Sequence, residues 1–151
     1  MKSLHVTCDQ YTSVATELCS TLPVVDSRAT VLALHGDLGA GKTTFTQALA
    51  SVLGVTETVN SPTFVIQKQY DTANSMWSRL VHMDAYRLDS DTDLTPLRLS
   101  EVIADPDVLL VVEWPEHIAA VLPSDTVHIY FTVVDAETRA LQIMMPSDKK
   151  I

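Results

Sequence analysis

The sequence predicts one α/β domain in which helices flank a central mixed β-sheet. Two short apolar, β-branched runs, Thr30 to His35 and Val108 to Val112, have the composition of buried parallel strands. A glycine-rich turn follows the first run, and a helical pattern follows the turn. The chain has 151 residues and no Pro/Gly-rich linker, so we treat residues 1–151 as a single domain.

The elements of the first half follow from apolar spacing and from residues that end helices. Val14, Leu18 and Leu22 recur at helical spacing, and Pro23 ends that pattern. Gly54 ends the helix that follows the glycine-rich turn. The predicted elements are a short edge strand over Leu4 to Thr7, a helix over Thr12 to Leu22, a strand over Thr30 to His35 and a helix over Lys42 to Leu53.

The second half predicts further strands around the second apolar run. A polar stretch, Asp71 to Ser75, indicates a hairpin loop between two strand candidates. The predicted elements are strands over Phe64 to Tyr70 and Arg79 to Asp84, a helical segment over Leu94 to Ala104 interrupted near Pro96, a strand over Val108 to Val112, a short helix over Pro115 to Ala120, and a closing antiparallel pair over Val127 to Val134 and Arg139 to Met145. The alternation favours a central sheet with helices outside.

Composition excludes several classes of protein. Ten basic and nineteen acidic side chains give a net charge of -9, so the overall field does not attract nucleic acid. Cys8 and Cys19 form no CxxC motif or disulfide framework, and the histidines show no zinc spacing. No segment approaches the roughly 18 apolar residues needed to span a bilayer. We therefore expect a cytoplasmic protein that makes no membrane contact.

The segment with the clearest chemistry is Gly36-Asp37-Leu38-Gly39-Ala40-Gly41-Lys42-Thr43, which fits G-x-x-x-x-G-K-S/T. Its glycines let the backbone approach phosphates closely, and successive N–H groups and the next helix N-terminus face the anion. Lys42 can neutralise the β- and γ-phosphates, and Thr43 can offer its hydroxyl to Mg²⁺. Since no guanine-reading segment is present, the loop predicts a P-loop NTPase domain that binds ATP with Mg²⁺. The alternative is a purely structural turn.

A Mg-nucleotide site also needs an acidic group at the end of a neighbouring strand. Glu113 follows the run VLLVV, and Asp84 follows a second strand candidate. Either carboxylate can hold the metal while the other orients the attacking water; the pattern favours Glu113 for the metal. Thr63 is either a sensor of the γ-phosphate or part of a turn that leads into a strand. Trp114 stacks near the nucleotide or a partner, or belongs to the core.

In order along the chain, these motifs resemble the bacterial TsaE (YjeE) family, small P-loop ATPases needed for threonylcarbamoyladenosine in tRNA. The likeness rests on the loop extended through Thr44-Phe45, and on the segments Ser61-Pro62-Thr63-Phe64, Asp84-Ala85-Tyr86-Arg87-Leu88, Glu113-Trp114-Pro115 and Val121-Leu122-Pro123. Its spacing holds from about Asp9 to Ile143. The glycine that usually precedes the matching arginine is absent before Arg139, so a contact between Arg139 and the nucleotide stays open.

The resemblance implies a role for each matched residue. It implies ATP binding by Thr12, Gly36, Asp37, Leu38, Gly39, Ala40, Gly41, Lys42, Thr43, Thr44 and Trp114. It implies catalytic roles for Lys42, Thr63, Asp84 and Glu113, with Thr43 and Glu113 as Mg²⁺ ligands. Family members act with TsaB and TsaD, of which TsaD transfers threonylcarbamoyl to tRNA, so the ATPase meets tRNA only indirectly. The alternative function is a small-molecule phosphotransferase, although the chain has no cluster of arginines to form a lid.

Overall fold

The computed structural model describes residues 1–62, 66–89 and 94–148. These residues form one seven-stranded sheet in the order β1-β7-β6-β2-β5-β4-β3. The strands are β1 (Lys2–Thr7), β2 (Thr30–His35), β3 (Gln67–Asp71), β4 (Arg79–Asp84), β5 (Val108–Glu113), β6 (Val127–Val133) and β7 (Thr138–Met144). β6, β2, β5 and β4 are parallel, while β3 at one edge and β7 and β1 at the other pair antiparallel. The predicted central mixed sheet is confirmed.

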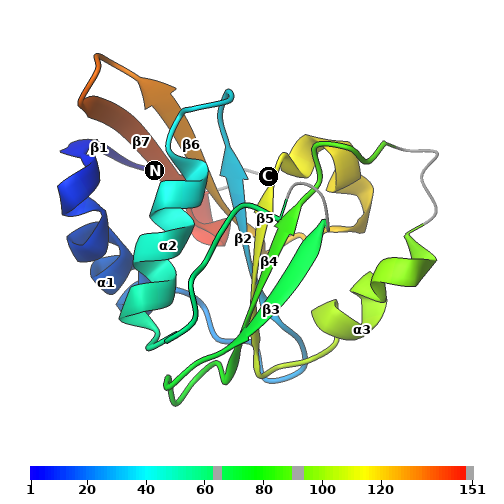
Figure 1. The fold of residues 1–151 in the computed structure, drawn as a ribbon. Helices are drawn as coiled ribbons and strands as arrows, with labels where there is room; N and C mark the ends of the chain where they lie inside the picture. The colour runs from blue at the N-terminus through cyan, green and yellow to red at the C-terminus, as the bar shows by residue number, and fades with distance from the viewer. Residues whose placement is uncertain (63–65, 90–93, 149–151) are drawn as a thin grey trace.

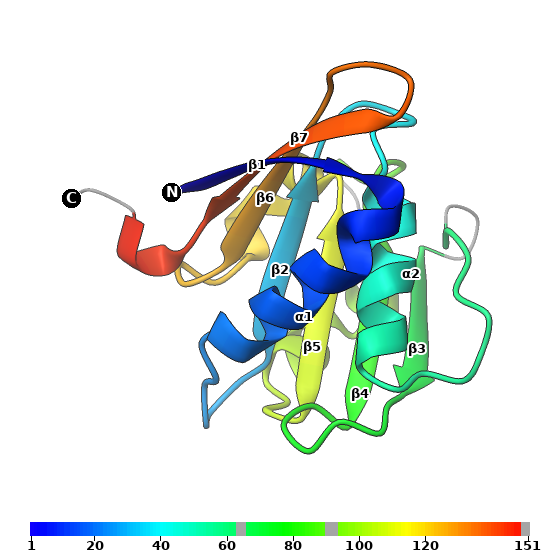
Figure 2. The ribbon, with the colours of Figure 1, turned by 90° about the vertical axis from the view of Figure 1, so that its left-hand side faces the viewer.

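Helices cover both faces of this sheet (Figures 1 and 2). α1 (Tyr11–Thr21) and α2 (Lys42–Val52) pack side by side on one face. α3 (Leu99–Ile103) and the 3₁₀ segment η3 (Pro115–Val121) lie on the other. Three further 3₁₀ turns are η1 (Cys8–Gln10), η2 (Thr95–Leu97) and η4 (Pro146–Asp148). In the described part of the chain, no helix has the length and apolar character that crossing a bilayer requires.

Two apolar clusters fill the spaces between the sheet and its helices. Leu109 and Val111 of β5 pack in the cluster under α1 and α2, whereas Leu110 and Val112 pack in the cluster with α3 and η3. Side chains alternate between the faces of a strand, so a central strand needs apolar residues at every position. This explains the continuous run in β5. By the same alternation, Glu113 points to the face that α2 covers.

The structure corrects three of the predicted boundaries. The strand predicted over Phe64 to Tyr70 begins at Gln67, because Ile66 has a left-handed φ of 68° that a strand does not accommodate. Residues 63–65 lie outside the described residues. The helical segment predicted over Leu94 to Ala104 is interrupted as expected, but the break between η2 and α3 lies at Arg98, whose φ is 51°, rather than at Pro96. The short helix after Pro115 is of the 3₁₀ type.

Candidate functional site

The glycine-rich loop joins β2 to α2, as the sequence predicts. Gly41 is the N-cap of α2 and has φ 104°, a conformation that residues with a Cβ rarely adopt. A Cβ on Gly41 would lie 2.5 Å from the hydroxyl oxygen of Tyr11, which is fully buried beneath the loop. α2 then begins at Lys42, and its first N–H groups have no partner within the helix. The loop thus brings backbone donors and a helix N-terminus to one place, as an anion site requires.

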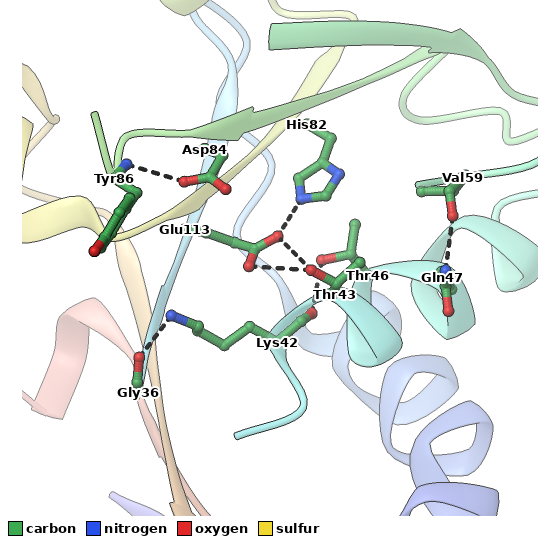
Figure 3. A network of polar contacts seen from close by, with 10 residues as sticks. All are labelled: Gly36, Lys42, Thr43, Thr46, Gln47, Val59, His82, Asp84, Tyr86 and Glu113. Carbon is green, nitrogen blue, oxygen red and sulfur yellow. Dashed lines mark hydrogen bonds and ion pairs between the residues drawn. The ribbon is translucent and has the colours of Figure 1, made fainter. Parts of the chain in front are cut away.

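Lys42 lies almost buried at this site, with 5% of its surface exposed. Its ammonium donates to the carbonyl oxygen of Gly36 at 2.6 Å (Figure 3). The same ammonium lies 3.7 Å from the ring centroid of Trp114. Burial lowers the pKa of the Lys42 ammonium, an effect that Glu113 and other nearby carboxylates oppose. An anionic phosphate beside the ammonium would favour its charged form.

Asp84 and Glu113 end neighbouring strands, side by side. β4 and β5 run parallel with Asp84 opposite Glu113, so both carboxylates lie at the carboxyl edge of the sheet, and both are buried. Thr43 Oγ1 lies 3.3 and 3.1 Å from the two carboxylate oxygens of Glu113. Asp84 Oδ1 accepts the Tyr86 N–H at 2.9 Å. A hydroxyl and a carboxylate in contact are hard oxygen ligands of the kind Mg²⁺ prefers, so Thr43 and Glu113 fit a shared magnesium site.

The Trp114 ring lies against the Lys42 ammonium, and two further rings lie near Trp114. Trp114 directly follows β5 in a left-handed conformation, with φ 57°. Its ring lies 5.1 Å from that of Tyr86 and 6.1 Å from that of His117, measured between centroids. His117 Nδ1 lies 2.8 Å from the carbonyl oxygen of Ala85, which connects this cluster to the end of β4. The Trp114 ring lies against the P-loop lysine, and it also packs, partly buried, against the apolar cluster of α3 and η3.

The loop, the two carboxylates and Trp114 line one cleft of about 230 Å³. Of the predicted residues, the cleft contains Leu38, Gly39, Gly41, Lys42, Thr43, Thr44, Asp84, Glu113 and Trp114. Gly36, Asp37 and Ala40 shape the loop behind it: Gly36 holds Lys42, and the Ala40 N–H donates to Asp37 at 3.0 Å.

Of the two remaining predicted residues, one is described and does not line the cleft, and the other lies outside the described residues. Thr12 is exposed on α1 and does not line it among the residues the structure places. Thr63 lies outside the described residues. Conversely, the cleft contains Cys8, which the sequence did not indicate, and Arg139, whose Nε donates to Ala40 O at 3.2 Å. β1 and β7 pair beyond β6, so only the folded sheet brings Cys8 and Arg139 to the loop.

His82 also contacts this site, although the sequence analysis placed it only within the strand predicted over Arg79 to Asp84. Its Nε2 lies 2.5 Å from Glu113 Oε2, and its side chain is completely buried. The signal was present in the sequence, because His82 precedes Asp84 by two positions. Residues two apart on a strand share a face of the sheet.

Comparison with known proteins gives matches over most of the chain. The family model described as "Threonylcarbamoyl adenosine biosynthesis protein TsaE" matches residues 7–141. A Bacillus subtilis protein named "tRNA threonylcarbamoyladenosine biosynthesis protein TsaE" is 46% identical over 99 residues, which cover 66% of this chain and 59% of that protein. A Treponema pallidum protein of the same name is 36% identical over 113 residues, 75% of this chain and 80% of that one. The chain thus spans less than two thirds of the Bacillus relative.

A solved structure gives the same result for the fold. The crystal structure of YdiB from Bacillus subtilis superposes with a TM-score of 0.71 and 31% sequence identity. The superposition covers 95% of this chain and 86% of that chain.

Proposed function

This chain belongs to the TsaE family, and from that premise we propose that it is a cytoplasmic ATPase that binds ATP with Mg²⁺ and supports the formation of threonylcarbamoyladenosine in tRNA. The observation that carries the proposal is the contact between the phosphate loop and the end of β5. There the hydroxyl of Thr43 meets the carboxylate of Glu113, one residue from the buried ammonium of Lys42. Nucleotide hydrolysis needs these three groups together.

Each residue then has a part in the reaction. Backbone N–H groups of the loop and the Lys42 ammonium hold the β- and γ-phosphates. Thr43 and Glu113 hold Mg²⁺, which when bound neutralises charge that develops on the phosphates. Asp84 orients the attacking water, since its carboxylate lies at the end of the adjacent strand, in register with Glu113. Trp114 covers the lysine and excludes solvent from the phosphates. Thr63 is proposed to sense the γ-phosphate.

The partners in this proposal are TsaB and TsaD. TsaD transfers the threonylcarbamoyl group, and ATP hydrolysis by this chain resets the complex between turnovers. A net charge of -9 supports an indirect relation to tRNA, because the nucleic acid would have to be held by the partners. We therefore expect slow hydrolysis by the chain alone and strong stimulation by the TsaB–TsaD pair.

The test compares Lys42→Ala, Glu113→Gln and wild type by calorimetry with ATP and by phosphate release with and without TsaB–TsaD. Losing charged hydrogen bonds to phosphate should weaken ATP binding by Lys42→Ala about 10- to 150-fold. Glu113→Gln should keep measurable nucleotide binding and lose Mg²⁺-dependent turnover. Glu101→Gln is the control, because it removes an exposed carboxylate on α3, on the opposite face of the sheet.

Three results would contradict the proposal. Unchanged ATP affinity in Lys42→Ala would remove the loop from nucleotide binding. A wild-type rate in Glu113→Gln would remove that carboxylate from catalysis. Phosphate transfer from ATP to a small metabolite, without stimulation by TsaB–TsaD, would support the phosphotransferase instead.

A further inference from the structure

His82 is a polar ring in an otherwise apolar layer. It lies in β4 between Leu80 and Asp84 on the sheet face that α2 covers, and none of its surface is exposed. Val111 is its partner in β5, and Val111 belongs to the same apolar cluster. An aliphatic side chain would fill this position without the cost of burying ring nitrogens. A polar contact is therefore needed to account for a histidine at this position.

The polar contact of His82 is Glu113. Nε2 lies 2.5 Å from Glu113 Oε2, while Nδ1 is buried and has no hydrogen-bond partner among the described residues. The arrangement fits a neutral imidazole with its proton on Nε2, which donates to the carboxylate and leaves only an acceptor lone pair unpaired at Nδ1. The opposite tautomer would bury an unpaired N–H and set a lone pair against the carboxylate oxygen.

Glu113 is thus held from two sides. The Thr43 hydroxyl approaches both carboxylate oxygens from α2, and His82 donates to Oε2 from deeper in the sheet (Figure 3). A glutamate side chain has three rotatable bonds, and a ligand fixed in one rotamer loses less entropy when it binds a metal. The His82 contact selects the rotamer in which the carboxylate faces Thr43.

We propose that His82 is a positioning residue for the metal site: its Nε2–H orients the Glu113 carboxylate and thereby sets the affinity for the divalent cation. The inference rests on the proposed Mg-nucleotide function. His82 is not among the described residues that line the cleft, so the proposal places it behind Glu113, outside the nucleotide and the metal. Its effect is exerted through Glu113, so metal affinity should change while the affinity for metal-free nucleotide should not.

The experiment measures Mn²⁺ binding to the protein–ADP complex by electron paramagnetic resonance, and ADP binding in EDTA by calorimetry. His82→Leu should weaken Mn²⁺ binding about 10- to 100-fold, the usual effect of losing a group that supports a metal ligand. ADP affinity in EDTA should stay within about 3-fold of wild type, because the backbone cradle is untouched. The Mn²⁺ spectrum of the remaining complex should broaden as Glu113 becomes mobile.

Two further substitutions separate orientation from packing. The amide nitrogen of glutamine reaches the place of the imidazole Nε2, so His82→Gln should restore Mn²⁺ affinity to within about 3-fold of wild type. The amide nitrogen of asparagine reaches only the place of Nδ1, so His82→Asn should bind Mn²⁺ as weakly as His82→Leu. Leu80→Ala is the matched control, because it removes buried volume from the same face of β4. It should reduce stability and leave Mn²⁺ affinity unchanged.

Wild-type Mn²⁺ affinity in His82→Leu would overturn the inference, as would an equal loss in Leu80→Ala. Failure of His82→Gln to bind Mn²⁺ more tightly than His82→Asn would do the same. If the wild-type protein binds no ADP, the proposed function itself fails. If the wild-type protein binds ADP and substitutions at position 82 leave the Mn²⁺ affinity unchanged, the proposed function stands and only the role of His82 is refuted.

Discussion

Gly41→Ala places a methyl group where the loop has no room for one. The new Cβ would lie 2.5 Å from the Tyr11 hydroxyl oxygen, well inside van der Waals contact. Tyr11 cannot move aside easily, because its ring is fully buried and packs edge-on against Phe45 and Phe131, with centroids 5.5 and 6.3 Å away. We therefore expect this small substitution to destabilise the fold itself, apart from any effect on nucleotide binding.

Two terms set the size of the effect. A residue with a Cβ at φ 104° costs about 1–2 kcal/mol in backbone strain. Overpacking against a rigid buried ring costs about 1–3 kcal/mol more. The expected loss in the free energy of unfolding is thus about 2–5 kcal/mol, a large part of the 5–15 kcal/mol typical of a domain.

The protein supplies its own control for the strain. Gly39 also has a positive φ, 80°, but a Cβ there meets no atom within 4 Å. Gly39→Ala should therefore cost only the strain, about 1–2 kcal/mol. Tyr11→Phe removes the clashing oxygen, so in the Gly41→Ala background it should recover about 1–3 kcal/mol, and in Gly39→Ala nothing.

The assay is urea unfolding followed by circular dichroism, without nucleotide so that ligand binding adds nothing to stability. Equal losses for Gly41→Ala and Gly39→Ala would refute the steric part of the reasoning. So would the absence of any recovery when Tyr11→Phe is added to Gly41→Ala.

Two further predictions concern titratable groups. Cys8 is exposed in the phosphate cleft, whereas burial raises the pKa of the Cys19 thiol to about 11. At pH 8 only about one Cys19 in a thousand is a thiolate, so iodoacetamide should label Cys8 first. ATP should slow the labelling of Cys8. Mass spectrometry locates the label, and labelling of Cys19 before Cys8 would contradict the prediction. Burial lowers the pKa of His35 below 6.5, an effect that Lys42 adds to and Glu116 opposes. At a pH between this lowered pKa and about 6.5, the unfolded chain therefore binds more protons than the folded chain. The free energy of unfolding should fall as the pH drops below about 6.5. The fall should be shallower in His35→Gln by urea unfolding, and equal slopes would exclude His35 as its source.

Much of the site follows from local pattern. The run VLLVV predicts a buried strand, and the loop motif predicts the strand-to-helix turn and its lysine. The prediction that Asp84 and Glu113 each stand at the end of a strand depends only on the apolar runs before them. The structure confirms both strand ends, and it adds that the two strands are neighbours with Asp84 opposite Glu113.

The remainder depends on contacts between distant segments. Arg139 reaches the loop because β7 lies two strands from β2, an order that no local pattern encodes. Trp77 lies between the predicted hairpin loop and the strand predicted from Arg79, yet it is fully buried, and its ring N–H donates to the Thr30 hydroxyl at 3.1 Å. The left-handed conformations of Ile66 and Arg98 oppose the usual preferences of these residue types, so the local pattern does not predict them.

The pairing of Asp84 with Glu113 has a consequence for how the chain tolerates changes in length. A strand's side chains alternate, so deleting one residue upstream in β4 or β5 would turn its terminal carboxylate to the opposite face. The acidic group would still be encoded, yet it would point toward α3 instead of Thr43. Length changes are harmless only where a loop absorbs them, as between β3 and β4. The site therefore depends on the number of residues in these two strands as well as on the identity of their side chains.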